Sequence, residues 1–156
     1  MDFAGAVKAG FQNYANFRGV ASRSAFWYWR LFLFIVNIAT TFLPVVGSLA
    51  SLALMMPDVS ITIRRTRDAG FSAWLQLLWL IPVGLFFAEL PSMFAFGEAH
   101  QIDFETASNS EISNVVLPIL LMALPSILAL LAVQLFFFIT FLLPTKTKEQ
   151  GNKYVK

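Results

Sequence analysis

The chain of 156 residues has no cysteine and only one histidine, His100. Without cysteine it cannot form disulfides, attack a substrate through a thiol or bind a metal through thiolates. One histidine without cysteine does not form a recognisable zinc site. The sequence also lacks the glycine patterns of nucleotide-binding loops and the G-x-S-x-G motif of serine hydrolases. These absences predict a protein that is not an enzyme and holds no metal and no cofactor.

Charge is also scarce, because only 13% of the residues are charged and 58% are hydrophobic. A typical soluble domain has about 25% charged and about 45–50% apolar residues. Three blocks carry no charge at all: Leu31–Pro57, Ser72–Ala88 and Ile112–Thr145. A soluble domain of this size cannot bury so much apolar surface. The composition therefore excludes an ordinary soluble domain, a disordered chain and a nucleic-acid-binding domain, and it predicts an all-α membrane protein.

The apolar blocks predict four transmembrane helices arranged in two hairpins. A helix needs about 20 mostly apolar residues to span the hydrocarbon core of a bilayer. The predicted spans are residues 26–43, 45–63, 74–96 and 115–143. The fourth is too long for one upright helix and is expected to be tilted or kinked at Pro125. For the first hairpin, one long helix and a re-entrant hairpin that never reaches the far side are the alternatives.

The distribution of positive charge favours two crossings in that first hairpin. All eleven Lys and Arg fall in three clusters, at residues 8–30, 64–67 and 146–156, whereas residues 97–114 have four acids and no Lys or Arg. Short loops rich in Lys and Arg stay in the cytoplasm. An even number of crossings therefore separates consecutive clusters. Both termini are predicted to be cytoplasmic, with 144–156 as a basic cytoplasmic tail and 97–114 as an acidic outer loop.

Residues 1–24 do not have the apolar core of a signal peptide. Five aromatic or apolar side chains recur every three or four residues instead, at Phe3, Val7, Phe11, Tyr14 and Phe17. This spacing predicts an amphipathic helix lying on the inner leaflet. Packing of the same stripe on another part of the protein is the alternative.

Several polar residues fall inside the predicted spans. Arg30 and Asp58 lie at similar depths in the first two helices, and charges inside spans tend to pair, so we expect an Arg30–Asp58 contact. Separate extension of both side chains to the membrane surface is the alternative. Asn37 and Gln134 also lie at comparable depths, in the first and fourth helices, and are expected to share a hydrogen bond.

Glu89 has no Lys or Arg on its side of the membrane. We expect it near the outer interface, with protonation or a role in handling protons or cations as alternatives. Asp103 and Glu105 in the outer loop could be read as an acid pair, but a solvated loop is the better explanation.

Three short stretches are more specific than composition. They are Phe17–Trp27 (F-R-G-V-A-S-R-S-A-F-W), Arg64–Trp74 (R-R-T-R-D-A-G-F-S-A-W) and Gly151–Tyr154 (G-N-K-Y). Together they resemble the bacterial inner-membrane proteins of the domain of unknown function 805 family. The chain departs from the usual family pattern at Val20, Ala25 and Arg67, where Arg, Glu and His are common. The resemblance implies a small multi-span inner-membrane protein without an assigned reaction.

The second stretch is predicted to connect two spans on the cytoplasmic side. Asp68 is expected to pair with a nearby arginine. A sharper hypothesis is a pocket for an anionic lipid headgroup or a small anion, built by the guanidinium groups of Arg23, Arg64, Arg65 and Arg67. The alternative is that these arginines only set the topology and contact lipid phosphates without selectivity.

The sequence therefore favours a protein that works by interaction, either as an accessory subunit or as a lipid-binding membrane protein. Its expected partners are anionic lipids, other membrane-protein subunits or a second copy of itself, and not nucleic acid. The second hypothesis is a small transporter or channel component, in which Asp58, Glu89, Asn37 and Gln134 line a path. A membrane enzyme acting on a lipid ranks last.

Overall fold

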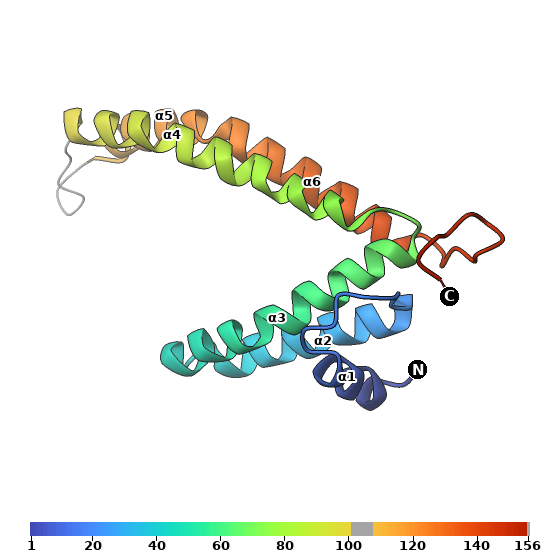
Figure 1. The fold of residues 1–156 in the computed structure, drawn as a ribbon. Helices are drawn as coiled ribbons and strands as arrows, with labels where there is room; N and C mark the ends of the chain where they lie inside the picture. The colour runs from blue at the N-terminus through green and yellow to red at the C-terminus, as the bar shows by residue number, and fades with distance from the viewer. Residues whose placement is uncertain (101–107, 156) are drawn as a thin grey trace. The chain divides into compact units, whose positions relative to one another are not determined.

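The computed structural model describes residues 1–100 and 108–155, and within these ranges every regular element is helical. The chain divides into two compact units. The first contains Met1–Gln76 and Phe138–Lys156, and the second contains Leu77–Phe137. Figure 1 shows the helices of each unit along the chain.

The first unit begins with α1 (Phe3–Gln12), whose N-terminus is capped by the Asp2 side chain. This helix packs against α2 (Arg23–Thr40) through edge-to-face aromatic pairs, Phe3 with Tyr28 and Phe11 with Trp29. Trp29 is completely buried, and a Cβ at Gly10 would overlap its ring. The predicted N-terminal helix is present. Part of its apolar stripe packs on the protein itself, which is the alternative left open by the sequence.

Helix α2 is followed after three residues by α3 (Pro44–Asp68), and the two helices pack side by side (Figure 1). Pro44 occupies the first turn of α3, where its missing N–H has no intrahelical partner to lose. The predicted spans 26–43 and 45–63 therefore correspond to two helices with shifted ends. Helix α3 continues five residues past its predicted end, so that Arg64, Arg65 and Asp68 are helical.

The second unit contains most of the third and fourth predicted spans. The third span is a 3-10 helix, η1 (Ala73–Trp79), that continues into α4 (Leu80–Ala99). The fourth consists of two helices, α5 (Asn109–Met122) and α6 (Leu124–Leu142), which are separated at Ala123. Because Pro125 has no N–H to donate to the preceding turn, the interruption falls just before it. The final residues of α6 belong to the first unit.

Three helical segments are long and apolar enough to cross a membrane: Pro44–Asp68, Ala73–Ala99 and Leu124–Leu142. At most 28% of the residues in their most apolar windows are buried within the protein. Such extensive apolar exposure is the property of a membrane protein rather than of a soluble domain. Helix α2 does not reach the same hydropathy, because it carries Arg23, Arg30 and Asn37. The number of crossings and the sidedness of the termini stay predictions.

Candidate functional site at the end of helix α3

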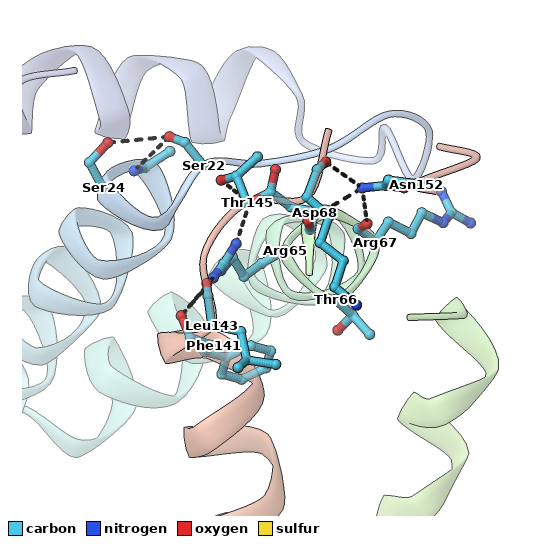
Figure 2. A network of polar contacts seen from close by, with 12 residues as sticks. Ser22, Ser24, Arg65, Thr66, Arg67, Asp68, Phe141, Leu143, Thr145 and Asn152 are labelled. Carbon is cyan, nitrogen blue, oxygen red and sulfur yellow. Dashed lines mark hydrogen bonds and ion pairs between the residues drawn. The ribbon is translucent and has the colours of Figure 1, made fainter. Parts of the chain in front are cut away.

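The last turn of α3 places Arg65 in a fully buried position. Its guanidinium group donates to the Asp68 carboxylate and to two backbone carbonyls at the end of α6 (Figure 2). Nε and Nη2 lie 3.2 and 2.9 Å from the Phe141 oxygen, and Nη2 also contacts the Leu143 oxygen. The last carbonyls of a helix lack intrahelical partners and carry a partial negative charge. Arg65 therefore caps the C-terminus of α6.

Asp68 is the anion that balances Arg65, and it is 1% exposed. Its Oδ2 also accepts a hydrogen bond of 2.7 Å from the Thr145 hydroxyl. The Asp68 backbone oxygen accepts from the Lys146 amide at 3.0 Å. One residue of α3 thus holds two consecutive residues of the C-terminal tail.

Asn152 completes this arrangement from the far end of the tail (Figure 2). Like Asp68, it is 1% exposed. Its Nδ2 lies 3.0, 3.3 and 3.1 Å from the backbone oxygens of Arg67, Asp68 and Lys146. Its Oδ1 accepts from the Tyr154 amide at 3.0 Å. We call the side chains of Arg65, Asp68, Thr145 and Asn152, with the backbone groups they bind, the polar node.

The chain leaves α3 through a tight turn at Gly70. Gly70 has φ +89°, a conformation that other L-residues adopt only with strain. The Gly70 amide donates to the Arg67 oxygen and the Phe71 amide donates to the Thr66 oxygen. This pattern ends a helix by satisfying its last carbonyls. The Gln76 side chain then returns to the Thr66 hydroxyl, to which it donates at 2.7 Å.

The segment before α2 packs on the same end of α3. The Ala21 amide donates to the Arg64 oxygen at 3.2 Å, and Arg67 donates to the Phe17 oxygen. One turn earlier, the Ser60 hydroxyl lies 2.9 and 2.8 Å from the backbone oxygens of Asn13 and Asn16. The three motif stretches, separated by up to 137 positions in the sequence, therefore meet around the last turns of one helix.

A family model described as a protein of unknown function (DUF805) matches residues 14–156. The chain belongs to the DUF805 family. Neither the curated proteins nor the solved structures include one similar to it. The matched region contains the whole polar node and all three motif stretches, whereas α1 lies before it.

In this DUF805 protein the four arginines of the predicted anion pocket have different surroundings. Arg23 is exposed. Arg64 is 8% exposed, and its Nε lies 3.4 Å from the Ser60 oxygen. Arg67 lies 5.4 Å over the Tyr154 ring in addition to its bond with Phe17. Arg65 uses its guanidinium inside the polar node. Arg65 is therefore committed to the protein and has no free edge for an anion.

The structure brings Arg30 and Asp58 together, with 3.1 Å between Nη1 and Oδ2. Arg30 also donates to the Thr62 hydroxyl at 3.1 Å and lies 5.1 Å over the Phe26 ring. The pair links α2 to α3 in a partly buried position. A groove of about 240 Å³ runs from Asp58 along the two helices, and its other polar lining residues are Asn37, Thr40 and Ser51.

The other polar residues of the predicted spans belong to different units. Asn37 donates to the Leu33 oxygen of its own helix at 2.8 Å. Gln134 is an exposed residue of the second unit, so its hydrogen bond with Asn37 stays a prediction. Glu89 accepts from the Ser126 amide at 3.1 Å. Asp103 and Glu105 lie outside the described residues, and residues 1–100 and 108–155 hold no cluster of three His, Asp or Glu side chains suited to a metal.

Sequence reasoning missed three residues that organise the DUF805 site: Ser60, Thr145 and Asn152. Asn152 lies in the third motif stretch, so the sequence marked its position but did not indicate which groups it binds. Ser60 and Thr145 lie outside the motif stretches. Their partners are backbone carbonyls or a residue 77 positions away, which no local pattern reveals.

Proposed function

We propose that this DUF805 protein is a small inner-membrane protein that works by interaction, and that its cytoplasmic face binds anionic lipid headgroups. The observation that supports this function is that the cations of the first unit differ in burial and in their partners. The polar node uses Arg65 internally, whereas five cations of the neighbouring segments and the tail are exposed. These are Arg18, Arg23, Lys146, Lys148 and Lys153.

The polar node determines where the tail lysines lie. Lys146 is held through its backbone amide on Asp68, which leaves its ammonium group 5.7 Å over the Phe71 ring. Lys153 lies 5.3 Å from the Tyr154 ring. Each juxtamembrane cation contributes about 1 kcal/mol of attraction to an anionic surface. A fixed tail presents its lysines together and loses less conformational freedom on binding than a mobile tail.

Native mass spectrometry of the protein released from nanodiscs tests the proposal. The nanodiscs contain equal amounts of phosphatidylglycerol and phosphatidylcholine. We expect the wild type to retain phosphatidylglycerol selectively. The triple variant K146Q/K148Q/K153Q is expected to lose that selectivity by at least about tenfold, because three contributions of about 1 kcal/mol are removed. Retention by the wild type should also fall with increasing salt.

A charge reversal at Lys148 provides a matched comparison with Lys8. Both lysines are exposed, but Lys8 lies on α1 and outside the node. Lys148→Glu should reduce phosphatidylglycerol retention more than Lys8→Glu, although both change the net charge equally. Equal retention by the two variants, or selectivity that survives the triple substitution, contradicts headgroup binding at this face.

The same spectra test a protein partner. A stoichiometric companion that co-purifies from the membrane supports an accessory-subunit role. A peak at twice the chain mass supports self-association. If that companion dissociates from a variant that loses the tail contacts, such as Asn152→Ala, its binding surface is the cytoplasmic face that the polar node holds in place. A companion that stays bound to this variant places the partner elsewhere on the protein.

The proposed sidedness is testable directly, because the chain contains no cysteine that would react in the background. Single cysteines at Val46, Ser110 and Lys148 replace exposed residues. A membrane-impermeant maleimide applied to intact spheroplasts should label the first two positions and leave the third unlabelled until the membrane is opened. Labelling of Lys148→Cys from outside overturns cytoplasmic headgroup binding. Protection of Val46→Cys indicates a re-entrant first hairpin.

A transporter or channel component is the second candidate, and the α2–α3 groove favours it. Asp58, Asn37 and Ser51 line that groove inside the predicted membrane region. Glu89 and Gln134 would have to complete the path from the second unit. Flux of a small polar solute into proteoliposomes that Asp58→Asn abolishes supports this candidate. Flux that is absent from wild-type proteoliposomes contradicts it.

A further inference from the structure

The second unit holds a carboxylate that has no cationic side chain to balance it. Residues 77–137 contain no Lys and no Arg. Glu89 nevertheless lies within α4, in one of the three segments able to span a membrane. A charged residue in such a segment normally pairs, or else marks a functional site.

Glu89 contacts the interruption between α5 and α6. Its Oε1 accepts from the Ser126 amide at 3.1 Å, in the first turn of α6, where backbone N–H groups lack intrahelical partners. Its Oε2 is buried and has no hydrogen-bond partner among the described residues. The helix end therefore satisfies half of the carboxylate, and the other half is left as an acceptor without a donor.

A groove of about 460 Å³ begins beside this contact. Ser126 lines it and is the residue whose amide binds Glu89. The α4 side is aromatic, with Trp79, Phe86 and Phe87, and the α6 side continues with Ile127 and Leu130. The Ser126 hydroxyl already donates to the Ala123 oxygen at 2.9 Å. The groove thus has the volume of a small-molecule site and walls that are almost entirely apolar.

We propose that this groove binds a hydrophobic organic cation, with the charge attracted by Glu89 and the apolar body packed against Trp79 and Phe86. Glu89 does not itself line the groove, but it follows Phe86 by three residues, about one turn along α4, and it binds the amide of Ser126, which does line it. Aromatic rings attract cations through their negative faces. A carboxylate without a counter-cation adds a net attraction that is strong where water is excluded. An anion of equal shape is repelled by the same carboxylate.

This site is independent of the proposed headgroup-binding face, because it lies in the other unit and selects the opposite charge. Tetraphenylphosphonium and tetraphenylborate are suitable probes, since they share shape and apolar area and differ in the sign of their charge. The protein is placed in phosphatidylcholine nanodiscs, whose lipids carry no net charge. Binding is measured by equilibrium dialysis against protein-free nanodiscs.

We expect tetraphenylphosphonium to bind saturably, with one site per chain, and tetraphenylborate to show only the partitioning of empty nanodiscs. Glu89→Gln should weaken binding of the cation at least about tenfold, as expected for removal of one charge from a site of low dielectric. Glu98→Gln is the matched control, because Glu98 is an exposed carboxylate of the same helix. Its binding should equal that of the wild type.

Leu130→Trp supplies a second variant, which fills the groove and leaves Glu89 in place. Loss of cation binding in this variant supports a site in the groove, including in the case that Glu89→Gln does not fold. Equal binding of the cation and the anion shows a lipid-chain groove without charge selection and overturns the proposal. Cation binding that neither substitution weakens places the site elsewhere and also overturns it.

Discussion

The two units of this chain differ in how completely their charged groups are paired and hydrogen-bonded. In the first, Arg65 and Asp68 are less than 2% exposed and satisfy each other, a helix C-terminus and the tail. In the second, Glu89 binds the N-terminus of α6 through one oxygen, and its other oxygen has no hydrogen-bond partner within residues 1–100 and 108–155. Both ends of α6 are thus met by a side chain of complementary charge, a carboxylate at its start and a guanidinium at its end.

This difference separates a structural site from a site available for a ligand. A buried ion pair whose remaining groups are also satisfied has no donor or acceptor left for a ligand. A buried carboxylate with a free oxygen has one. Arg65, which the sequence suggested as part of an anion pocket, is therefore structural. The groups that remain available to a ligand are the exposed cations of the first unit and the Glu89 carboxylate of the second.

The largest effect is expected for Asp68→Asn. The substitution leaves the Arg65 guanidinium buried without its anion, which should reduce the free energy of unfolding by about 3–5 kcal/mol. A denaturant titration in micelles measures it. The double variant R65M/D68L should recover part of the loss, because it removes both charges together but also removes the donor to the Phe141 and Leu143 oxygens. Equal stability of Asp68→Asn and the wild type would show that Arg65 does not depend on its anion.

Asn152→Ala should have the next largest effect. It removes a buried amide that donates to three backbone carbonyls, which should destabilise the tail by about 1–3 kcal/mol. Limited proteolysis is the direct measurement, with cleavage between residues 146 and 153 expected to accelerate while α3 stays protected. Substitution of the exposed neighbour, Lys153→Ala, serves as the control. Equal cleavage rates in the two variants contradict a role for the Asn152 amide.

Glu89 should show a smaller effect on stability. Glu89→Ala removes the cap of α6 and is expected to lower the free energy of unfolding by about 1 kcal/mol, whereas Glu89→Gln keeps an acceptor and should lose less. Thermal unfolding in micelles compares the two variants. If Glu89→Gln is as unstable as Glu89→Ala, the negative charge rather than the hydrogen bond holds the end of α6.

The smallest effect is expected at the start of α5. The Ser108 hydroxyl and backbone N–H both donate to the Glu111 carboxylate, which lowers the pKa of Glu111 below its ordinary value. The stabilisation is therefore present above the ordinary glutamate pKa and is lost as pH falls through the lowered one. A carbon-detected NMR titration of Glu111 should give a midpoint below that of an unstructured peptide. Ser108→Ala should move the midpoint only part of the way toward the peptide value, because it removes the hydroxyl donor and keeps the backbone N–H.

The sequence predicted the elements well, because the signals for helices are local. The spacing of Phe3, Phe11 and Tyr14 predicted α1, and Pro44 marked the start of α3. The two charges Arg30 and Asp58 were matched by depth, which is a count of residues along two neighbouring helices. Pro125 indicated a kink but not a complete interruption at Ala123. The Ser126 amide just after it binds the Glu89 carboxylate, a contact that no local pattern reveals.

The site was harder to predict, because its partners are largely backbone carbonyls. Arg65 binds oxygens of residues 76 and 78 positions away, and carbonyl groups leave no trace in the sequence. Arginines 64, 65 and 67 look alike in the sequence, and only the direction of each on α3 distinguishes a buried cap from a contact at the surface. A pattern of charge therefore located the site without assigning the roles of its members.

Hydrogen exchange at the Lys146 amide tests the polar node most directly. That amide is exposed to solvent in a free tail but donates to the Asp68 oxygen at 3.0 Å in the folded protein. In nanodiscs we predict exchange at least about tenfold slower than in an unstructured peptide, with the protection reduced in Asp68→Asn, which keeps this backbone oxygen but destabilises the node around it. Exchange at the peptide rate in the wild type would contradict the attachment of the tail to α3, and with it the face proposed to bind headgroups.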